Sequence, residues 1–381
     1  MTRYSDVMMN TFGPPQRVLV KGEGLYVWDE AGNKYLDLLG GIAVNVLGHG
    51  DQALIKAVAD QMSTLGHVSN FFASEPQMSL AEKLLELLGH DGKVFFTNSG
   101  AEANEAGFKL TRLTKRTKII AAENGFHGRT MGALALTHKL AYREPFMPLP
   151  GEVEFVPFGD SAALAKAVDQ DAAAILLEPI QGEAGVVDAP DGYLQLAREL
   201  ADKHGALLWF DEVQTGIGRT GAWFAHQHQQ VVPDVVTLAK GLGGGLPIGA
   251  CVALGPAADL FNPGSHGSTF GGNPVATRAG LTVLNEIAQR NLLSNAIEMG
   301  DYIRAGVSSH VKATTGKGLL IGLVLQNENA AALQTRLLEN GVIVNAPRAD
   351  RLRLAPALTI EKTHADEAIA AINEAIEESA K

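Results

Sequence analysis

Seven short apolar runs between residues 93 and 254 constrain the fold more than any other feature of this 381-residue chain. None of the runs alternates polar with apolar residues, which is typical of strands buried on both faces of a sheet. Helix-like or loop segments separate them, as in a parallel sheet wrapped by helices. We therefore predict an α/β fold with a mostly parallel, seven-stranded sheet. The runs are 93–97, 118–122, 153–157, 173–177, 206–210, 235–238 and 250–254.

Both ends of the chain predict a second, smaller unit. Residues 17–39 have an extended pattern, interrupted by a Gly-Asn turn. After about residue 280 the pattern becomes a helix, several strand-like segments and a final helix with Ile369, Ile372 and Ile376 on one face. We expect a smaller α/β domain formed by both termini. The predicted division is 1–50 (N-terminal part of the small domain), 51–280 (large domain) and 281–381 (C-terminal part of the small domain).

The net charge and the cysteine content argue against several kinds of partner and cellular location. The chain has 31 Lys+Arg against 42 Asp+Glu, a net charge of −11, so binding to nucleic acid or to an anionic membrane is not expected. Cys251 is the single cysteine, which excludes an intrachain disulfide and suits a reducing compartment. We find neither an uninterrupted apolar stretch of membrane-spanning length nor a signal-peptide core, and expect a cytoplasmic protein.

Residues that follow the predicted strands are candidates for a ligand site, because open α/β sheets bind ligands beyond the carboxyl ends of their strands. Ser99 and Glu102 follow the first run with capping-box spacing, and they flank Gly100 and Ala101. A helix beginning there offers free N–H groups and the positive end of its dipole, which favour a phosphate. Taken alone, the same motif also fits a plain helix cap.

Two charged residues follow later runs. Asp211 directly follows the run 206–210, where a buried carboxylate needs a cationic partner such as a pyridinium ring, or a neighbouring Lys or Arg. Lys240 follows the run 235–238 and is surrounded by small residues. A desolvated lysine loses its proton more easily, as a nucleophile requires, although a solvated loop lysine fits the pattern too.

A glycine-flanked loop after the second run carries Phe126 and Arg129. The ring could stack on a planar cofactor and the arginine could bind a carboxylate, or the two could be a packed ring and a surface charge. The segment 178–183 after the fourth run and Arg353 near the C-terminus are further candidates.

Two other motifs are interpreted as decoys. The G-x-G-x-x-G match at 216–221 does not directly follow a strand and lacks the acidic residue expected about 20 positions later. His226 and His228 lack an obvious third ligand, so we interpret them as surface polar residues and predict no metal site.

Jointly and in this order, the motifs resemble those of the class III (ω-type) pyridoxal-phosphate aminotransferases of fold type I. The resemblance covers nearly the whole chain, from about residue 20 to beyond 355, and within the family it is greatest to the acetylornithine aminotransferase branch. The motifs are NSGAEANEAGFK, GFHGRT, EPIQGE, DEVQTGIGRTG, AKGLGGGLPIGA, HGSTFGGNP and RLAP.

The resemblance implies pyridoxal 5'-phosphate as cofactor and a role for each matching residue. Lys240 would form the Schiff base and move the substrate proton, and Asp211 would keep the pyridine nitrogen protonated. Gln214 would approach the phenolic oxygen, and Phe126 would stack on the ring. The phosphate would bind the helix start, at Ser99, Gly100 and Ala101, together with Thr269 of a neighbouring subunit, which implies a homodimer with shared active sites.

The resemblance also implies a substrate and a switch. Arg129, with Ser268 nearby, would bind the carboxylate of acetylornithine, and Arg353 would bind the α-carboxylate of glutamate. Glu183 would mask Arg353 while the ω-amine is bound. The reaction would be ping-pong, between N-acetylornithine plus 2-oxoglutarate and N-acetylglutamate 5-semialdehyde plus glutamate, in arginine biosynthesis.

The sequence leaves other aminotransferases of the family, and an aminomutase, as alternatives. Ornithine aminotransferases have a tyrosine where Phe12 is the best match and a tryptophan in place of His127, whereas GABA-type enzymes share the His-Gly-Arg loop. Use of a succinyl-diaminopimelate substrate is compatible with the same motifs. A pyridoxal-phosphate aminomutase would have asparagine in place of Glu183 and would lack Arg129.

Overall fold

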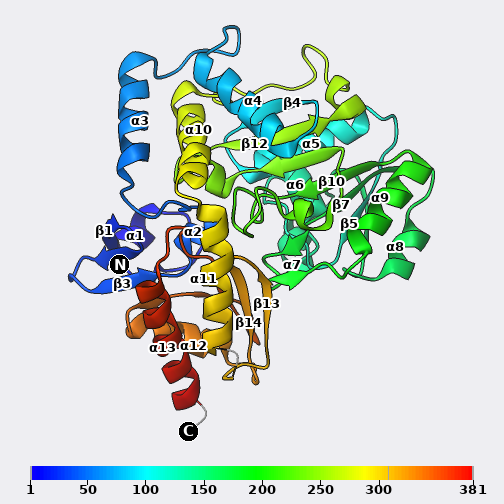
Figure 1. Cartoon of the computed structure of the whole chain (residues 1–381). Helices are drawn as coiled ribbons and strands as arrows, with labels where there is room; N and C mark the ends of the chain where they lie inside the picture. The colour runs from blue at the N-terminus through cyan, green and yellow to red at the C-terminus, as the bar shows by residue number, and fades with distance from the viewer. Residues whose placement is uncertain (1, 308, 380–381) are drawn as a thin grey trace.

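A seven-stranded sheet lies at the centre of the larger part of the molecule (Figure 1). The computed structural model describes residues 2–307 and 309–379. All strands of this sheet run parallel except β12, which is antiparallel to both of its neighbours. In spatial order the strands are β4 (Gly92–Thr97), β12 (Gly249–Leu254), β11 (Val235–Leu238), β10 (Leu207–Asp211), β7 (Ala172–Leu177), β5 (Lys118–Ala122) and β6 (Glu152–Val156).

The prediction of a seven-stranded, mostly parallel sheet is confirmed, and each apolar run matches one strand to within a residue at either end. Every residue of β7, β11 and β12 is buried, which explains why their sequences do not alternate. The direction of β12 was not visible in its sequence, because a doubly buried strand has the same composition in either direction.

Helices cover both faces of this sheet. On one face, α5 (Gly100–Arg112) packs over Trp209 and Cys251. The other face is covered at one end by α8 (Ser161–Ala167) and α9 (Tyr193–His204), and at the other by α4 (Glu75–Leu88) and α10 (Pro274–Gln289). Shorter elements complete this part: α3 (Gln52–Thr64), α6 (Met131–Leu136), α7 (Leu140–Arg143), β8 (Ile180–Gln181), β9 (Val187–Asp188), and the 3-10 helices η1 (Glu144–Phe146), η2 (Ala225–Gln229), η3 (Lys240–Gly243) and η4 (Gly255–Asp259).

The two ends of the chain share one sheet in the smaller part of the molecule. Its strands are β1 (Leu19–Glu23), β2 (Tyr26–Asp29), β3 (Lys34–Asp37) and β15 (Val342–Ile343). β15 lies parallel to β3 and pairs Val342 with Leu36. The predicted contribution of both termini is therefore confirmed, and Figure 1 shows the N-terminal segment (blue) beside the C-terminal helices (orange and red).

A second, antiparallel sheet and three helices complete this smaller part. The strands, in spatial order, are β13 (Ala313–Lys317), β14 (Leu320–Val324), β17 (Arg351–Leu354) and β16 (Asn345–Arg348). The helices are α11 (Leu292–Val307), α12 (Ala330–Glu339) and α13 (Lys362–Ser379), and the N-terminal α1 (Thr2–Val7) and α2 (Gly40–Ala43) precede them in the chain. The division at 50 and 280 stays a proposal, and residue 280 lies inside α10.

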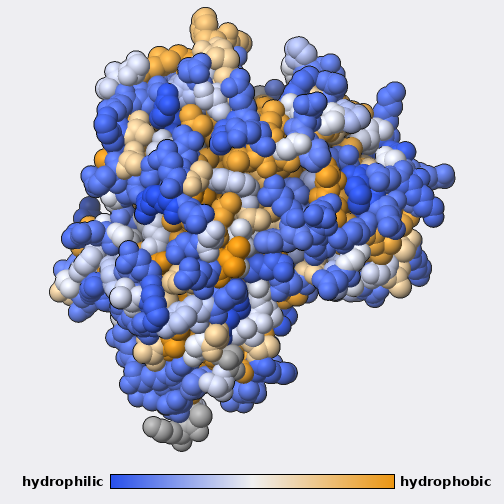
Figure 2. All heavy atoms as spheres, viewed as in Figure 1, coloured by the Kyte–Doolittle hydropathy of each residue, from blue (hydrophilic) through white to orange (hydrophobic). Residues whose placement is uncertain are grey.

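The molecular surface in Figure 2 mixes polar and apolar residues, with apolar residues at the top of the view and further apolar patches across its middle. Over the loop between α3 and α4, at the top of that view, Phe71 and Phe72 are 92% and 69% exposed. Across residues 2–307 and 309–379, the structure contains no helix with the length and apolar character needed to span a bilayer.

Candidate active site

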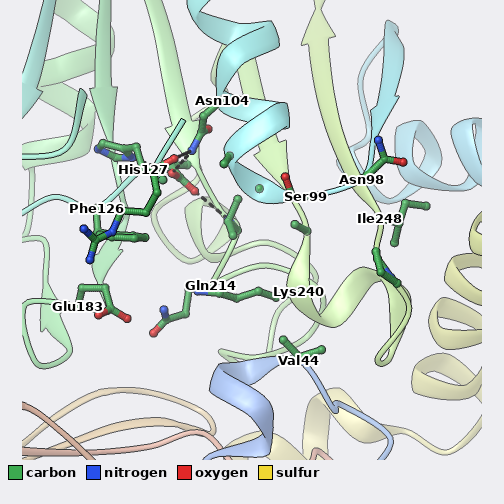
Figure 3. A pocket seen from close by; sticks show the side chains of 18 of the residues that line it. Val44, Asn98, Ser99, Asn104, Phe126, His127, Glu183, Gln214, Lys240 and Ile248 are labelled. Carbon is green, nitrogen blue, oxygen red and sulfur yellow. Dashed lines mark hydrogen bonds and ion pairs between the residues drawn. The ribbon is translucent and has the colours of Figure 1, made fainter. Parts of the chain in front are cut away.

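A pocket of about 440 Å³ lies beyond the carboxyl ends of the parallel strands (Figure 3). Most of its side chains come from the segments that follow β4, β5, β7, β10 and β11, and Val44 and the segment before β12 complete the lining. The position agrees with the rule for open α/β sheets, and the volume suits a small ligand. Nine of the predicted site residues line it: Ser99, Gly100, Ala101, Phe126, Arg129, Glu183, Asp211, Gln214 and Lys240.

The start of α5 is built as an anion site. The Ser99 hydroxyl accepts a hydrogen bond from the amide of Glu102 at 3.1 Å, and the Glu102 carboxylate accepts one from the amide of Asn98 at 2.8 Å. The capping arrangement thus satisfies the amides on either side of Gly100 and Ala101. These two residues begin the helix, so their own N–H groups have no acceptor within it and remain available to an anion in the pocket.

Asp211 is held by neutral and histidine donors rather than by a lysine or arginine. Its Oδ2 accepts from Asn104 Nδ2 at 2.8 Å and from His127 Nδ1 at 2.7 Å, and its Oδ1 accepts from the amide of Val213 at 3.0 Å. The carboxylate is 4% exposed. The salt bridge to a nearby Lys or Arg, one of the two partners that the sequence allowed, is therefore not formed.

Two further buried groups surround Asp211. Burial alone would lower the pKa of His127, but its hydrogen bond to Asp211 outweighs this and raises the pKa. Burial raises the pKa of Glu178 to about 7. Glu178 accepts from the amides of Phe126 at 3.0 Å and Gly182 at 3.3 Å, so one carboxyl joins two loops that line the pocket.

Lys240 begins η3 directly after β11, with its backbone in the left-handed region at φ 44°. This conformation is strained for a residue with a side chain, and such strain is concentrated at functional sites. In Figure 3 its side chain extends into the pocket beside Gln214. Burial, and secondarily the positive charge of Arg353, lower the pKa of Lys240 to about 8, so the neutral amine is accessible near physiological pH.

Arg353 lies just outside the pocket lining and is 1% exposed. Its Nη1 donates to Glu183 Oε1 at 2.6 Å and to Gln214 Oε1 at 3.0 Å, and its Nη2 donates to Asn345 Oδ1 at 2.7 Å. Burial would raise the pKa of Glu183, but Arg353 outweighs burial and the pKa is lowered. The predicted contact between Glu183 and Arg353 is therefore present in the structure.

Arg129 has a different environment at the outer end of the pocket. It is exposed, and its guanidinium carbon lies 3.4 Å from the ring centroid of Tyr142 in α7. Stacking of this kind occupies the face of the guanidinium and leaves the in-plane N–H donors free. Within residues 2–307 and 309–379, Arg129 forms no ion pair with a carboxylate, so its donors are available to a ligand.

Ser268 and Thr269 are not brought into this pocket. They line a separate cavity of about 940 Å³ with Phe71 and Asn70, on the side of the exposed aromatic loop. Ser268 is linked to the pocket indirectly, since Asn98 Nδ2 donates to its hydroxyl at 3.3 Å. Among the residues that the structure describes, Thr269 does not line the pocket that contains Lys240, so the predicted role at the phosphate needs a second subunit.

The interpretation of His226 as a surface residue is wrong. It is 4% exposed, and its Nδ1 lies 2.7 Å from an oxygen of the fully buried Glu212. The ring is also stacked beside Phe224. The buried carboxylate of Glu212 needs an internal partner, and His226 supplies one.

Three residues of the site were not singled out as functional candidates. Asn104 lies one helical turn after Gly100, and this spacing places it on the same face of α5 as the anion site. His127 lies between the predicted residues Phe126 and Arg129, but its contact with Asp211 is between distant segments. Glu178 lies in the candidate segment 178–183, but the sequence assigned no role to this residue.

The family follows from comparison with known proteins. A family model described as aminotransferase class-III matches residues 8–376. The chain belongs to the class III aminotransferases. It is 55% identical to an acetylornithine aminotransferase of Mycolicibacterium smegmatis over 384 residues, which span 100% of this chain and 98% of the relative. A relative of the same name from Streptomyces coelicolor is 55% identical over 366 residues, 94% of this chain and 90% of its own.

Solved structures of this family share the fold. An ornithine aminotransferase from Toxoplasma gondii superposes with a TM-score of 0.95 at 30% identity, covering 99% of this chain and 94% of that one. An acetylornithine aminotransferase from Elizabethkingia anophelis gives 0.89 at 34% identity, covering 99% and 98%. The enzyme is thus an aminotransferase that depends on pyridoxal phosphate, and the architecture is that of fold type I.

The residues of this pocket fit that cofactor. Free amides at the start of α5 suit its phosphate, and the buried carboxylate of Asp211 suits its ring nitrogen. The pocket also offers Phe126 as an aromatic wall and the amine of Lys240 as a nucleophile of lowered pKa.

Proposed function

We propose that this aminotransferase interconverts N-acetylornithine plus 2-oxoglutarate and N-acetylglutamate 5-semialdehyde plus glutamate, in arginine biosynthesis. The observation that carries the proposal is the 55% identity over the full chain to enzymes named acetylornithine aminotransferase. The pocket supports it, because Arg129 and Arg353 provide separate places for the carboxylates of an ω-amine and of an α-amino acid.

In this proposal the cofactor is held by the residues that line the inner end of the pocket. When bound, pyridoxal phosphate supplies an electron sink and carries the amino group between the two substrates. The amides of Gly100 and Ala101 and the cap residue Ser99 hold the phosphate. Phe126 covers one ring face, and Gln214 approaches the phenolic oxygen.

Lys240 and Asp211 act on protons in this scheme. The lowered pKa of Lys240 allows its Nζ to accept a proton from the substrate carbon and then to return it. Asp211 keeps a proton on the ring nitrogen, and His127 and Asn104 hold the carboxylate in place through its Oδ2. Both of these partners are buried, so little reorganisation accompanies the proton movement.

The two half-reactions need the pocket to change its charge. While Glu183 neutralises Arg353, the inner site is suited to the uncharged chain of an ω-amine whose carboxylate is bound by Arg129. Release of Glu183 frees Arg353 to bind the α-carboxylate of glutamate. Gln214 also accepts from Arg353, and Gly182 leaves room for its side chain because a Cβ at residue 182 would clash with Gln214.

We further propose that the active unit is a cytoplasmic homodimer with shared active sites, in which Thr269 reaches the phosphate bound by the other subunit. The exposed Phe71 and Phe72 and the large cavity beside Thr269 support an interface on that face. The lone, buried Cys251 fits a reducing compartment. Sedimentation of the purified protein and complementation between Lys240→Ala and Thr269→Ala subunits test the shared site.

Half-reactions followed by visible absorption test the substrate. The purified holoenzyme is mixed with N-acetylornithine, ornithine or GABA, each without a keto acid, and loss of the cofactor's aldehyde-form absorbance is recorded. We expect conversion at the lowest concentration with N-acetylornithine. Equal or better conversion with ornithine or GABA would contradict the substrate assignment and leave the aminotransferase assignment intact.

A further inference from the structure

A side cavity of about 290 Å³ adjoins the outer end of the active-site pocket, and both are lined by Phe126 and Glu183. Its other walls come from the start of α7 and from β16, so it lies between the larger and smaller parts of the molecule. The residues that matter for its chemistry are Lys139, Leu140, Tyr142, Pro347 and Arg348.

This cavity carries positive charge that no carboxylate neutralises. Lys139 Nζ donates to the Tyr142 hydroxyl at 3.3 Å, and Arg348 Nη1 donates to Asn124 Oδ1 at 3.1 Å. In the described part of the chain neither cation has a carboxylate within salt-bridge distance. Glu183 is the one acid among the lining residues, and its carboxylate is bound to Arg353. His138, also in the lining, adds no negative charge.

Tyr142 connects the cavity to the site of the substrate carboxylate. It lines the cavity and also stacks against Arg129. In N-acetylornithine the α-carboxylate and the α-nitrogen are attached to the same carbon. Binding of the carboxylate by Arg129 therefore keeps the α-nitrogen and its substituent close to Arg129, which stacks on Tyr142 at the edge of the cavity.

We propose that this cavity is the subsite for the N-acyl group, and that Lys139 and Arg348 select acylated substrates by repelling a free α-ammonium group. The inference deepens the proposed function and rests on it. Acylation turns a cation into a neutral amide, which removes the repulsion. Leu140 and Pro347 offer apolar contact to the acyl methyl group, and the Tyr142 hydroxyl is a hydrogen-bonding partner for the amide.

The expected selectivity from charge is moderate, because Lys139 and Arg348 are exposed and water screens them. Removing both should lower the ratio of kcat/KM for N-acetylornithine to kcat/KM for ornithine by roughly three- to tenfold. The ratio isolates the α-nitrogen, because both substrates present the same carboxylate and the same ω-amine. Loss of attraction for the carboxylate therefore cancels.

The test is steady-state kinetics of the holoenzyme with both substrates for Lys139→Met, Arg348→Met and the double variant. The double variant Lys166→Met/Lys312→Met is the matched control, because it removes two exposed positive charges from residues that do not line the cavity. We expect the ratio to fall in the double variant through a gain with ornithine, to keep its wild-type value in the control, and to fall in the wild type as salt is raised from 20 to 500 mM.

A ratio that is the same in the double variant and the wild type would overturn the proposal, as would an equal loss with both substrates, since that result indicates a structural role. The single variants keep the test valid if the double variant does not fold. Failure of the proposed function is distinguishable, because wild-type enzyme would then show no preference for N-acetylornithine before any residue is changed.

Discussion

The inner and outer ends of the pocket are built on opposite electrostatic principles. At the inner end, Asp211 is buried and both of its oxygens accept hydrogen bonds from protein donors. At the outer end, Arg129 is exposed, rests on the ring of Tyr142 and has no acid beside it in the described chain. The inner end is preorganised for a resident group, whereas the outer end leaves its positive charge for an incoming substrate to neutralise.

Arg353 combines both principles. It is as buried as the inner residues, but one of its partners is Glu183, a carboxylate that lies on a loop and is partly exposed. A buried arginine with a removable counter-charge can serve a substrate that is present for only half of the reaction cycle. The three environments therefore give separate predictions for the buried Asp211, for Arg353 with its removable partner, and for the exposed Arg129.

The largest effect is expected at the inner end, for Lys240→Ala. Removal of the amine that moves the substrate proton should lower kcat by at least about a thousandfold. The measurement is turnover of N-acetylornithine with 2-oxoglutarate at saturating cofactor. Lys115→Ala, at an exposed turn outside the pocket, is the control. Turnover within tenfold of wild type would remove Lys240 from the chemistry.

Asp211→Asn should lower kcat by about a hundredfold or more, because the neutral amide no longer stabilises positive charge on the ring nitrogen or on His127. Asp171→Asn is a matched control on an exposed turn. Cofactor binding is measured in the same samples by absorbance. If activity recovers fully when more cofactor is added, Asp211 contributes to affinity alone and the prediction is wrong.

The inner end of the pocket can also be tested without catalysis, through the free energy of unfolding. In the cofactor-free protein the pKa of Lys240 is about 8 when folded, against 10.5 for the free side chain, so the unfolded state binds more protons between these values. Folding is therefore penalised below pH 8, and stability rises as the pH passes from 8 to 10.5. Lys240→Met should stabilise the cofactor-free protein by up to about 3 kcal/mol at pH 7.

Urea unfolding at pH 7 and at pH 10 measures this difference. The stabilisation by methionine should be smaller at pH 10, where the wild-type lysine is mostly neutral in the folded state. A difference between variant and wild type that is the same at both pH values would show that packing, rather than charge, is responsible.

A roughly tenfold loss of kcat/KM is expected when Glu183 can no longer neutralise Arg353. In Glu183→Gln the guanidinium of Arg353 stays unneutralised when the ω-amine binds, so kcat/KM for N-acetylornithine should fall about tenfold, with a much smaller loss for glutamate. Comparing the two half-reactions in single-turnover experiments checks this. Equal losses for both amino donors would count against a switch.

The smallest effect on the kinetics is expected at the outer end of the pocket. Tyr142→Leu removes the ring beneath Arg129 and should raise KM for N-acetylornithine about three- to fivefold with little change in kcat. Tyr142→Phe keeps the stacking surface and should resemble wild type in this respect. If phenylalanine is as harmful as leucine, the ring face is not what positions Arg129.

How much of this could be predicted from sequence depends on whether contacts are local. The strands, the cap at Ser99 and the order of Asp211 and Lys240 follow from apolar runs and from residues directly after them. The partners of Asp211 could not be predicted, because Asn104 and His127 are 107 and 84 residues away along the chain. Tyr142 was missed for the same reason, since only the folded loop brings α7 against Arg129.

The pairing of β3 with β15 has a consequence for synthesis. Leu36 pairs with Val342, so the first sheet to leave the ribosome stays incomplete until most of the chain has been made. At ordinary elongation rates the delay is roughly 15–60 s. During that time the edge of β3 is a candidate for pairing with other nascent chains, whereas the seven-stranded sheet, which ends at Leu254, can already form. Chaperone demand should therefore be concentrated on the first 40 residues.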